Sequence, residues 1–321
     1  MKNIIFFLII ISFNSCENNL TIDLGEKLSN TTIHHKKNGK YKVWYINGKI
    51  KLEGNYQNEL KEGLFKKYNK KGELTDEGLY RKGIKEGFFK RYTNGKLTSI
   101  SFYNNNKKDS IYKKFHDNGK LAFIGFYKQG EKNGEFKKFH KNGQLYYKGL
   151  YKKGYKEGTF YKWYENGQIS DKKSYIKSHW HGPWEKWYAN GEKYSYTEYI
   201  NGNKDGKYKK WHENGALEYN GSYKNNLKNE KWIKYDDQGN LVSHIFYKNN
   251  QRHGSAKGWY NNGNIKYERS YINGIKEGKI KKYYANGNIQ YKGAYQNGNK
   301  NGTWKKYNEK GNLISSIRYK N

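Results

Sequence analysis

Basic side chains recur at a fixed spacing and are the first candidates for a chemical role. Counted from a glycine that opens a repeat of 24 residues, the residue at offset four is basic in ten repeats. We call these residues the Lys column: Lys67, Arg91, Lys114, Lys138, Lys162, Lys186, Lys210, Lys234, Lys282 and Lys306. Such a row of cations attracts polyanions and binds them less tightly as salt rises. The same row also fits a simpler role, in which lysines solubilise a one-layer sheet and discourage edge pairing.

Two further columns carry lysines and rings. Offset three is also frequently lysine, and in an ideal strand it faces the side opposite to offset four. Offset six carries rings that could stack on sugars or nucleobases, or simply pack between repeats. The offset-six rings are Tyr45, His116, His140, Tyr164, Tyr188, His212, Tyr260 and Tyr284.

The spacing of the histidines and acidic residues does not favour a metal site or a catalytic site. Neighbouring hairpins are ~9.6 Å apart, so His116 and His140 are too distant to share a metal ion. His179 and His181 form the one close pair, and we expect them to occupy a locally altered turn. Acidic residues before the opening glycine are expected to pair with lysines of a neighbouring turn: Glu62, Glu86, Glu157, Asp205 and Glu277. Because they are spread along the array, no catalytic dyad, metal site or cofactor is expected, and the chain is predicted not to be an enzyme.

These columns are set by the repeat itself. Twelve repeats begin at offset zero and cover positions 39–321: Gly39, Gly63, Gly87, Ser110, Gly134, Gly158, Gly182, Gly206, Glu230, Gly254, Gly278 and Gly302. In one repeat, Leu145, Tyr147, Gly149 and Tyr151 alternate with a period of two, which indicates one face of a β-strand. The preceding strand runs from Phe136 to Phe139, whose odd spacing requires a bulge if both rings enter the core.

Two turns connect the strands. Asn142-Gly143 is typical of a hairpin because both residues tolerate a positive φ. The second turn has Gly or Asn at nine of eleven places, with Glu59 and Ser178 as the exceptions. This preference predicts a left-handed backbone conformation at that position. No segment has helical periodicity.

Aromatic residues on either side of a glycine carry a family resemblance. The element aromatic-x-Gly-x-Tyr occurs as Tyr147-x-Gly149-x-Tyr151 and again at 123–127, 219–223 and 291–295. Together with the Asn-Gly-x-Leu turn and the spacing, it resembles MORN repeats, in particular their bacterial MORN repeat variant branch. The resemblance implies an all-β fold: an elongated, single-layer antiparallel meander of about twelve β-hairpin repeats. Some bacterial members of this branch carry an antitoxin label.

Composition agrees with a folded but thin array. The chain has 321 residues with 63 Lys or Arg and 29 Asp or Glu, which gives a net charge of +34. Its 34 Tyr, 14 Phe and 9 Trp are too many aromatic residues for a solvated tail. The single cysteine, Cys16, excludes an intramolecular disulfide and a multi-cysteine zinc site.

The N-terminus is predicted to be an export signal. Lys2 precedes an apolar run at 4–11 that is too short to span a bilayer. Residues 1–15 therefore resemble a lipoprotein signal peptide, and Cys16 would be acylated after cleavage. An ordinary signal peptide with a chance cysteine is the alternative. Residues 16–38 are expected to form a polar tether, and 39–321 the repeat array.

These features predict a non-enzymatic scaffold anchored at the bacterial cell envelope, in the outer membrane or at the cell surface of a Gram-negative cell. Its basic aromatic surface would bind a protein, glycan or anionic lipid. The alternative is an antitoxin or immunity-type protein that neutralises a cognate toxin. The charge and the tyrosines also fit nucleic-acid binding, but an exported chain rarely meets cytoplasmic nucleic acid. The sequence leaves the partner and the oligomeric state open.

Overall fold

The computed structural model describes residues 19–22 and 38–320, which form strands and turns but no helix. The chain divides into two compact units, Met1–Glu131 and Lys132–Asn321. The N-terminal unit contains β1 (Asn19–Ile22), β2 (Gly39–Trp44), β3 (Ile50–Gln57), β4 (Leu60–Tyr68), β5 (Leu74–Arg81), β6 (Ile84–Thr93), β7 (Lys96–Asn104), β8 (Lys107–Phe115) and β9 (Leu121–Lys128).

The C-terminal unit continues the same pattern. Its strands are β10 (Glu131–Phe139), β11 (Leu145–Lys152), β12 (Tyr155–Trp163), β13 (Ile169–Ile176), β14 (His179–Trp187), β15 (Lys193–Ile200), β16 (Asn203–Trp211), β17 (Leu217–Lys224), β18 (Leu227–Tyr235), β19 (Leu241–Lys248), β20 (Gln251–Trp259), β21 (Ile265–Ile272), β22 (Ile275–Lys276), β23 (Gly278–Tyr283), β24 (Ile289–Gln296), β25 (Asn299–Tyr307) and β26 (Leu313–Tyr319).

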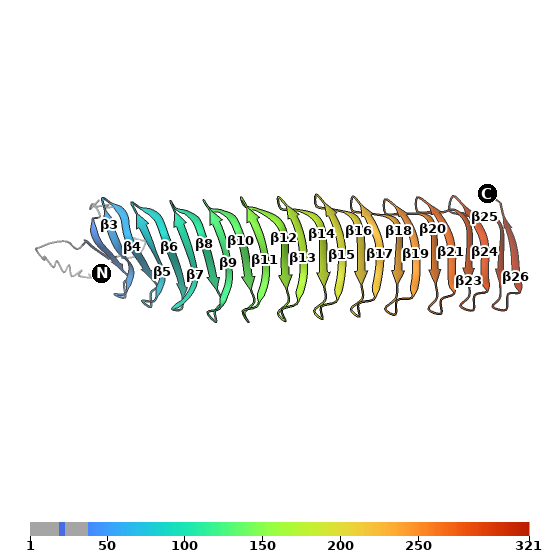
Figure 1. Ribbon diagram of the computed structural model, residues 1–321, viewed down its shortest axis with the longest axis horizontal. Helices are drawn as coiled ribbons and strands as arrows, with labels where there is room; N and C mark the ends of the chain where they lie inside the picture. Colours follow the sequence, from blue (N-terminus) through green and yellow to red (C-terminus); the bar gives the residue numbers. More distant parts are fainter. Residues whose placement is uncertain (1–18, 23–37, 321) are drawn as a thin grey trace, which may run out of the picture. The chain divides into compact units, whose positions relative to one another are not determined.

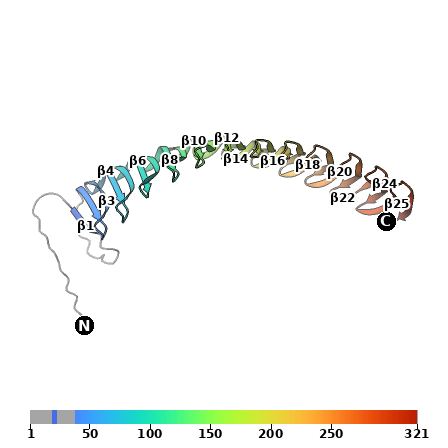
Figure 2. The same ribbon diagram turned by 90° about the horizontal axis from the view of Figure 1, so that it is seen from below.

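From β2 onward, consecutive strands within each unit pair antiparallel in chain order, as Figure 1 shows. The strand that would follow β21 is divided into β22 and β23, and both pieces pair with β21. Figure 2 shows each unit as a single layer of strands. The predicted all-β, single-layer antiparallel meander is therefore confirmed.

One strand lies within the segment predicted to be a tether. β1 pairs in parallel with β2, with Asn19 opposite Tyr41 and Ile22 opposite Trp44. Four residues of the 16–38 segment thus extend the sheet beyond the first repeat. The predicted signal peptide 1–15 and the acylated Cys16 lie outside the described residues.

The longer turn of most hairpins differs from its prediction at one residue, whereas Asn94-Gly95 follows the prediction with φ of 50° and 72°. Gly143 has a φ of 96°, but Asn142 does not adopt a positive φ. Instead, the Asn142 side chain accepts a hydrogen bond from the Gln144 N–H and donates one to the Glu165 carbonyl in the next repeat, at 2.9 and 3.0 Å. Asparagine is favoured here because its amide links one turn to the next.

The shorter turns confirm the left-handed requirement. Both central residues have positive φ, as at Asn58 (49°) and Glu59 (66°), which defines a type I′ turn. The two exceptions to Gly or Asn, Glu59 and Ser178, adopt the same conformation as the others. The position therefore demands this backbone shape whatever residue occupies it.

Each hairpin contains two strand irregularities. The register shifts between Lys138 and Phe139, but the extra residue is Tyr146 in the second strand. Phe136 and Phe139 therefore face opposite sides of the sheet, and the bulge that the sequence predicted between them is absent. A second shift occurs between Lys148 and Leu150, opposite the opening Gly158 of the next repeat, whose φ is 74°. The opening glycine of a repeat therefore lies inside a strand, at a kink that the sequence analysis did not anticipate.

Candidate anion-binding face

Aromatic rings form a row along one face of the sheet in each unit, which we call the aromatic face; in the C-terminal unit Ala256 and Ile280 interrupt the row. A ring from the first strand of a hairpin alternates with a tyrosine from the second strand. Phe65 lies 5.4 Å from Tyr56 and 5.2 Å from Tyr80 between ring centroids, in edge-to-face contacts. Phe136, at 2% exposure, is the most buried of these rings. Such contacts stabilise the sheet beyond simple apolar burial.

Glycine in the second strand makes room for these rings. A Cβ atom built on Gly149 would overlap the ring of Phe160, and one on Gly221 would overlap Trp232. The glycine of the aromatic-x-Gly-x-Tyr element is therefore needed because a ring lies directly against the backbone.

A row of cations caps the rings on one side, and the sequence analysis missed it. Lys61 Nζ lies 5.0 Å from the Phe65 centroid and 4.7 Å from Tyr80. We call the equivalent residues the ring-capping cations: Lys61, Lys85, Lys108, Lys132, Lys156, Lys204, Lys228, Arg252, Lys276 and Lys300. Their signal was present in the sequence, since a basic residue stands two positions before most opening glycines. Each ring-capping cation is attracted electrostatically to the negative face of a ring.

The Lys column lies on the other side of the ring row, on the same face. All ten residues are in the first strand of a hairpin, one repeat apart. Lys138 Nζ lies 5.6 Å from the Tyr147 ring and Lys186 Nζ 4.4 Å from Trp184. Among the described residues, only two column members contact a carboxylate: Arg91 with Asp76 at 3.0 Å and Lys210 with Glu218 at 2.6 Å.

The face on the other side of the sheet, which we call the opposite face, is better balanced. It carries the offset-three lysines, and four of the nine form ion pairs: Lys42, Lys90, Lys137 and Lys257. The hydrogen bond from Lys90 holds the pKa of Glu77 below its usual range. The lysines of the two faces therefore differ in how far neighbouring carboxylates neutralise them.

In the N-terminal unit the aromatic face contains a cavity of about 340 Å³. Small residues line it: Gly78 and Ser101 stand at the glycine position of the repeat, and Ser99 stands where the next two repeats place Phe123 and Tyr147. Seven basic residues line it, together with the carboxylates of Asp76 and Glu77: Lys61, Lys66, Lys67, Lys85, Lys90, Arg91 and Lys108. Burial, together with the neighbouring cations, lowers the pKa of Lys108. A bound anion would offset this repulsion.

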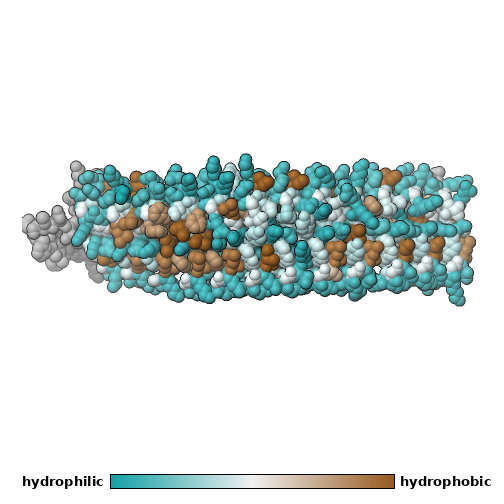
Figure 3. All heavy atoms as spheres, viewed as in Figure 1, coloured by the Kyte–Doolittle hydropathy of each residue, from teal (hydrophilic) through white to brown (hydrophobic). Residues whose placement is uncertain are grey.

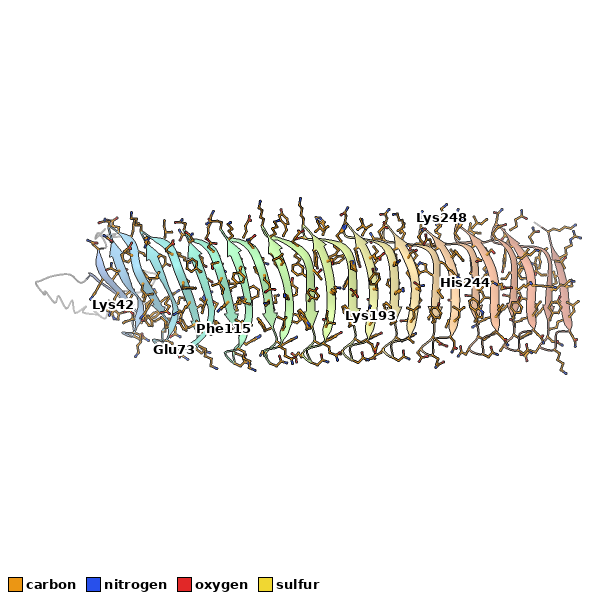
Figure 4. The ribbon with its side chains drawn as sticks, in the orientation of Figure 1. Lys42, Glu73, Phe115, Lys193, His244 and Lys248 are labelled. Atoms are coloured by element: carbon orange, nitrogen blue, oxygen red, sulfur yellow. The ribbon has the colours of Figure 1, made fainter. Side chains whose placement is uncertain are left out.

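Figure 4 locates the side chains along the strands of the C-terminal unit. Lys193 lies toward the edge formed by the longer turns, His244 lies in the middle of the sheet and Lys248 lies at the edge of the shorter turns. Both turn edges and the middle of the sheet therefore present basic or titratable groups, with the ring row between the edges.

The offset-six rings connect neighbouring repeats. Tyr45 donates a hydrogen bond to the Tyr68 carbonyl at 2.8 Å, and Tyr164 does the same to Trp187 at 2.7 Å. The ring of His140 lies 3.1 Å from the Trp163 carbonyl through Nε2. Of the two interpretations, the geometry supports packing between repeats, because the polar ends of these rings are engaged by backbone.

The histidine pair lies elsewhere than predicted. His179 and His181 belong to strand β14 rather than to an altered turn, and the turn before them has the same shape as its neighbours. Trp180, between them, occupies the place of a ring-capping cation and contacts Trp184 and Tyr199 at 5.4 and 5.2 Å. The described residues contain no group of three or more His, Cys, Asp or Glu placed to hold a metal ion.

The acidic column also has a different role from the predicted one. Glu62 accepts a hydrogen bond from the Lys82 N–H at 2.8 Å, and Glu277 accepts one from Asn297 at 2.8 Å. These carboxylates bind the backbone of the next short turn, whereas pairing with lysine side chains was expected. Asp205 does both, since it also contacts Lys224 at 3.3 Å.

Comparison with protein families shows which family the chain belongs to. A model described as MORN repeat variant matches ten segments that cover more than half of the sequence: 37–58, 108–129, 132–153, 156–177, 180–201, 204–225, 231–249, 252–273, 276–297 and 300–321. The chain belongs to the MORN repeat variant family. This membership supports a repeat scaffold for binding. A search of curated proteins finds no match. No helix able to span a membrane occurs among the described residues.

Proposed function

We propose that this MORN repeat variant protein is a non-enzymatic scaffold whose aromatic face binds an anionic partner at the cell envelope. The observation that carries the proposal is that two rows of cations lie beside the rings. In the part of the chain that the structure describes, Arg91 and Lys210 are the only members of the Lys column that contact a carboxylate. Cations that lack a neighbouring carboxylate gain most when an anion binds. A protein, a glycan and an anionic lipid all offer repeated negative charge to such a face.

Membrane attachment is the second part of the proposal and rests on the sequence. Residues 1–15 would direct export, and acyl chains on Cys16 would anchor the array. Acyl-chain labelling and fractionation of wild type and Cys16→Ala test this part. We expect labelled protein in the membrane fraction that the substitution removes. Unlabelled cytosolic protein that retains residues 1–15 would overturn it and favour a toxin-neutralising role.

The binding part is tested with neighbouring lysines on opposite faces. The variant Lys138→Gln/Lys282→Gln/Lys306→Gln removes three column cations. Its control, Lys137→Gln/Lys281→Gln/Lys305→Gln, removes the same charge from the preceding residue in each strand. The probes are dextran sulfate and vesicles of phosphatidylglycerol and phosphatidylcholine, which separate glycan-like from lipid binding.

We expect the column variant to bind about tenfold more weakly, with a smaller dependence on salt. The control variant should bind nearly as wild type does, because its lysines face away from the rings. Equal losses in both variants would mean that net charge alone attracts the probe, and would contradict a site on the aromatic face.

A further inference from the structure

Three neighbouring first strands of the N-terminal unit carry one charge pattern on the opposite face. In β4, β6 and β8, alternate residues are acidic, apolar and basic: Glu62-Leu64-Lys66, Glu86-Phe88-Lys90 and Asp109-Ile111-Lys113. In the C-terminal unit two repeats have both the acid and the lysine, and the residue between them is Lys207 in one and Lys279 in the other. The pattern is therefore confined to one part of the sheet.

The apolar members form a contiguous strip with residues of the second strands. Register places Leu64 opposite Leu79, Phe88 opposite Phe102 and Ile111 opposite Phe126; we call these six residues the apolar strip. Leu64, Leu79 and Phe88 are 45%, 46% and 51% exposed. Figure 3 shows hydrophobic side chains gathered over the strands of the N-terminal unit. A contiguous exposed apolar patch on a basic protein marks an interaction surface.

The first strands border the strip with charges of opposite sign on its two sides, whereas the second strands add Arg81 and Lys128 on the acidic side and Glu77 on the lysine side. Glu62 and Glu86 lie toward the short turns, where they accept hydrogen bonds from the backbone N–H groups of Lys82 and Asn105. Lysines lie on the other side of the strip, and Lys113 there forms no ion pair among the described residues. An anionic membrane would be repelled by the acidic border, and a uniformly acidic protein segment would be repelled in the same way.

We propose that the apolar strip is a homodimer interface, in which a second copy packs face to face about a two-fold axis parallel to the row of strands. This rotation reverses strand direction but preserves the order of repeats. The acidic border of one copy then faces the lysine border of the other, on both sides of the buried strip. A two-fold axis along the strands would instead place acid against acid. Two-fold self-complementarity of this kind is what a symmetric dimer requires.

The size of the strip predicts a weak dimer. Three hairpins span ~29 Å along the sheet, and six strand residues span ~20 Å, so each copy would bury ~600 Å². The total of ~1,200 Å² is at the lower end for specific interfaces. The net charge of +34 adds long-range repulsion between copies. We therefore expect reversible association at micromolar concentrations.

Complementary charge reversal tests both the surface and its symmetry. Sedimentation velocity of the full chain measures self-association of wild type, of Glu86→Lys/Asp109→Lys and of Lys90→Glu/Lys113→Glu. Each variant alone should dissociate about tenfold more readily, because like charges then face each other. A mixture of the two variants should form a heterodimer, since every border pair from the first strands is again of opposite sign.

Apolar substitutions supply the matched control. Phe88→Ser should weaken the dimer about tenfold, whereas Phe246→Ser should not; Phe246 lies opposite Lys231, at the place in the C-terminal unit that corresponds to Phe102. In a Cys16→Ser background, oxidised Phe88→Cys should form a covalent dimer because this residue lies at the two-fold axis. Circular dichroism verifies folding of each variant.

The proposed interface lies on the face away from the Lys column, so the proposals of anion binding and of dimerisation can be contradicted independently. Lys138→Gln/Lys282→Gln/Lys306→Gln should leave self-association unchanged. A wild-type chain that stays monomeric at high micromolar concentration would overturn the proposal. So would a dimer insensitive to Phe88→Ser, or a variant mixture that remains monomeric.

Discussion

Gly149 illustrates how one residue sets the distance between a ring and the backbone. The ring of Phe160 occupies the space that a Cβ atom at position 149 would need. Phe160 is 3% exposed and contacts Tyr151 and Tyr175 at 5.5 and 5.0 Å. A methyl group at position 149 would therefore displace a ring that joins two hairpins.

We expect Gly149→Ala to destabilise the sheet by about 1–3 kcal/mol through overpacking. Urea unfolding followed by tryptophan fluorescence measures the change. Leu150→Ala is the matched control, because Leu150 is the next residue, faces away from the ring row and is 48% exposed. Equal destabilisation by both substitutions would contradict the role assigned to the glycine.

Glu77 gives the opposite face a pH-dependent contribution. It accepts hydrogen bonds from Lys90 at 2.9 Å and from Tyr92 at 2.8 Å, and the first of these lowers its pKa. A carboxyl whose pKa is lower in the folded chain stabilises the fold above its unfolded pKa of about 4.3. That contribution is lost as pH falls through the folded pKa.

The variant Glu77→Gln should therefore be less stable than wild type at pH 7, by about 1 kcal/mol. The difference should shrink as pH falls below about 4, because the Glu77 carboxyl is then protonated first in the unfolded chain and, at lower pH, in the folded chain. Chemical denaturation of both chains across this range measures it. A difference that does not change with pH would mean that the carboxyl charge is not involved.

At the scale of the element, the short turns impose one backbone shape on every residue that occupies them. Gly83 has a φ of 79° at the position where Glu59 has 66°. Glutamate pays a steric penalty in this region that glycine avoids, although glycine loses more chain entropy on folding.

The substitution Glu59→Gly should consequently stabilise the N-terminal unit by about 0.5–1 kcal/mol. The reciprocal change, Gly83→Glu, should destabilise the same unit by a similar amount. Thermal unfolding measures both shifts. Shifts of the same sign would show that side-chain contacts, rather than φ, govern the turn.

The sequence predicted the elements better than the contacts between repeats. Asn142-Gly143 located a turn, but the odd spacing of Phe136 and Phe139 placed the bulge in the wrong strand, because the extra residue is Tyr146. The bond from Tyr164 to the Trp187 carbonyl was not predictable, because a backbone acceptor in the next repeat leaves no residue type to recognise. The ring-capping cations were missed for another reason: a lysine before glycine resembles ordinary turn chemistry until strand pairing places it over two rings.

At the scale of the whole molecule, charge dominates. The net charge of +34 opposes compaction, and salt reduces this repulsion. Chloride acts mainly by screening, whereas a divalent anion can also bind between cation rows. The aromatic face offers such places because the Lys column and the ring-capping cations lie beside the same row of rings; Lys114 and Lys108, for example, both lie over Tyr112.

Sodium sulfate should therefore raise the thermal midpoint more than sodium chloride at equal ionic strength, because any anion bound only by the folded sheet stabilises it by mass action. Sulfate also strengthens apolar burial generally, so the informative quantity is the sulfate–chloride difference compared between variants. Lys138→Gln/Lys282→Gln/Lys306→Gln should reduce that difference, while Lys137→Gln/Lys281→Gln/Lys305→Gln should retain it. Equal differences in the two variants would assign the effect to general salt action, since both have lost the same charge and differ only in the face that has lost it.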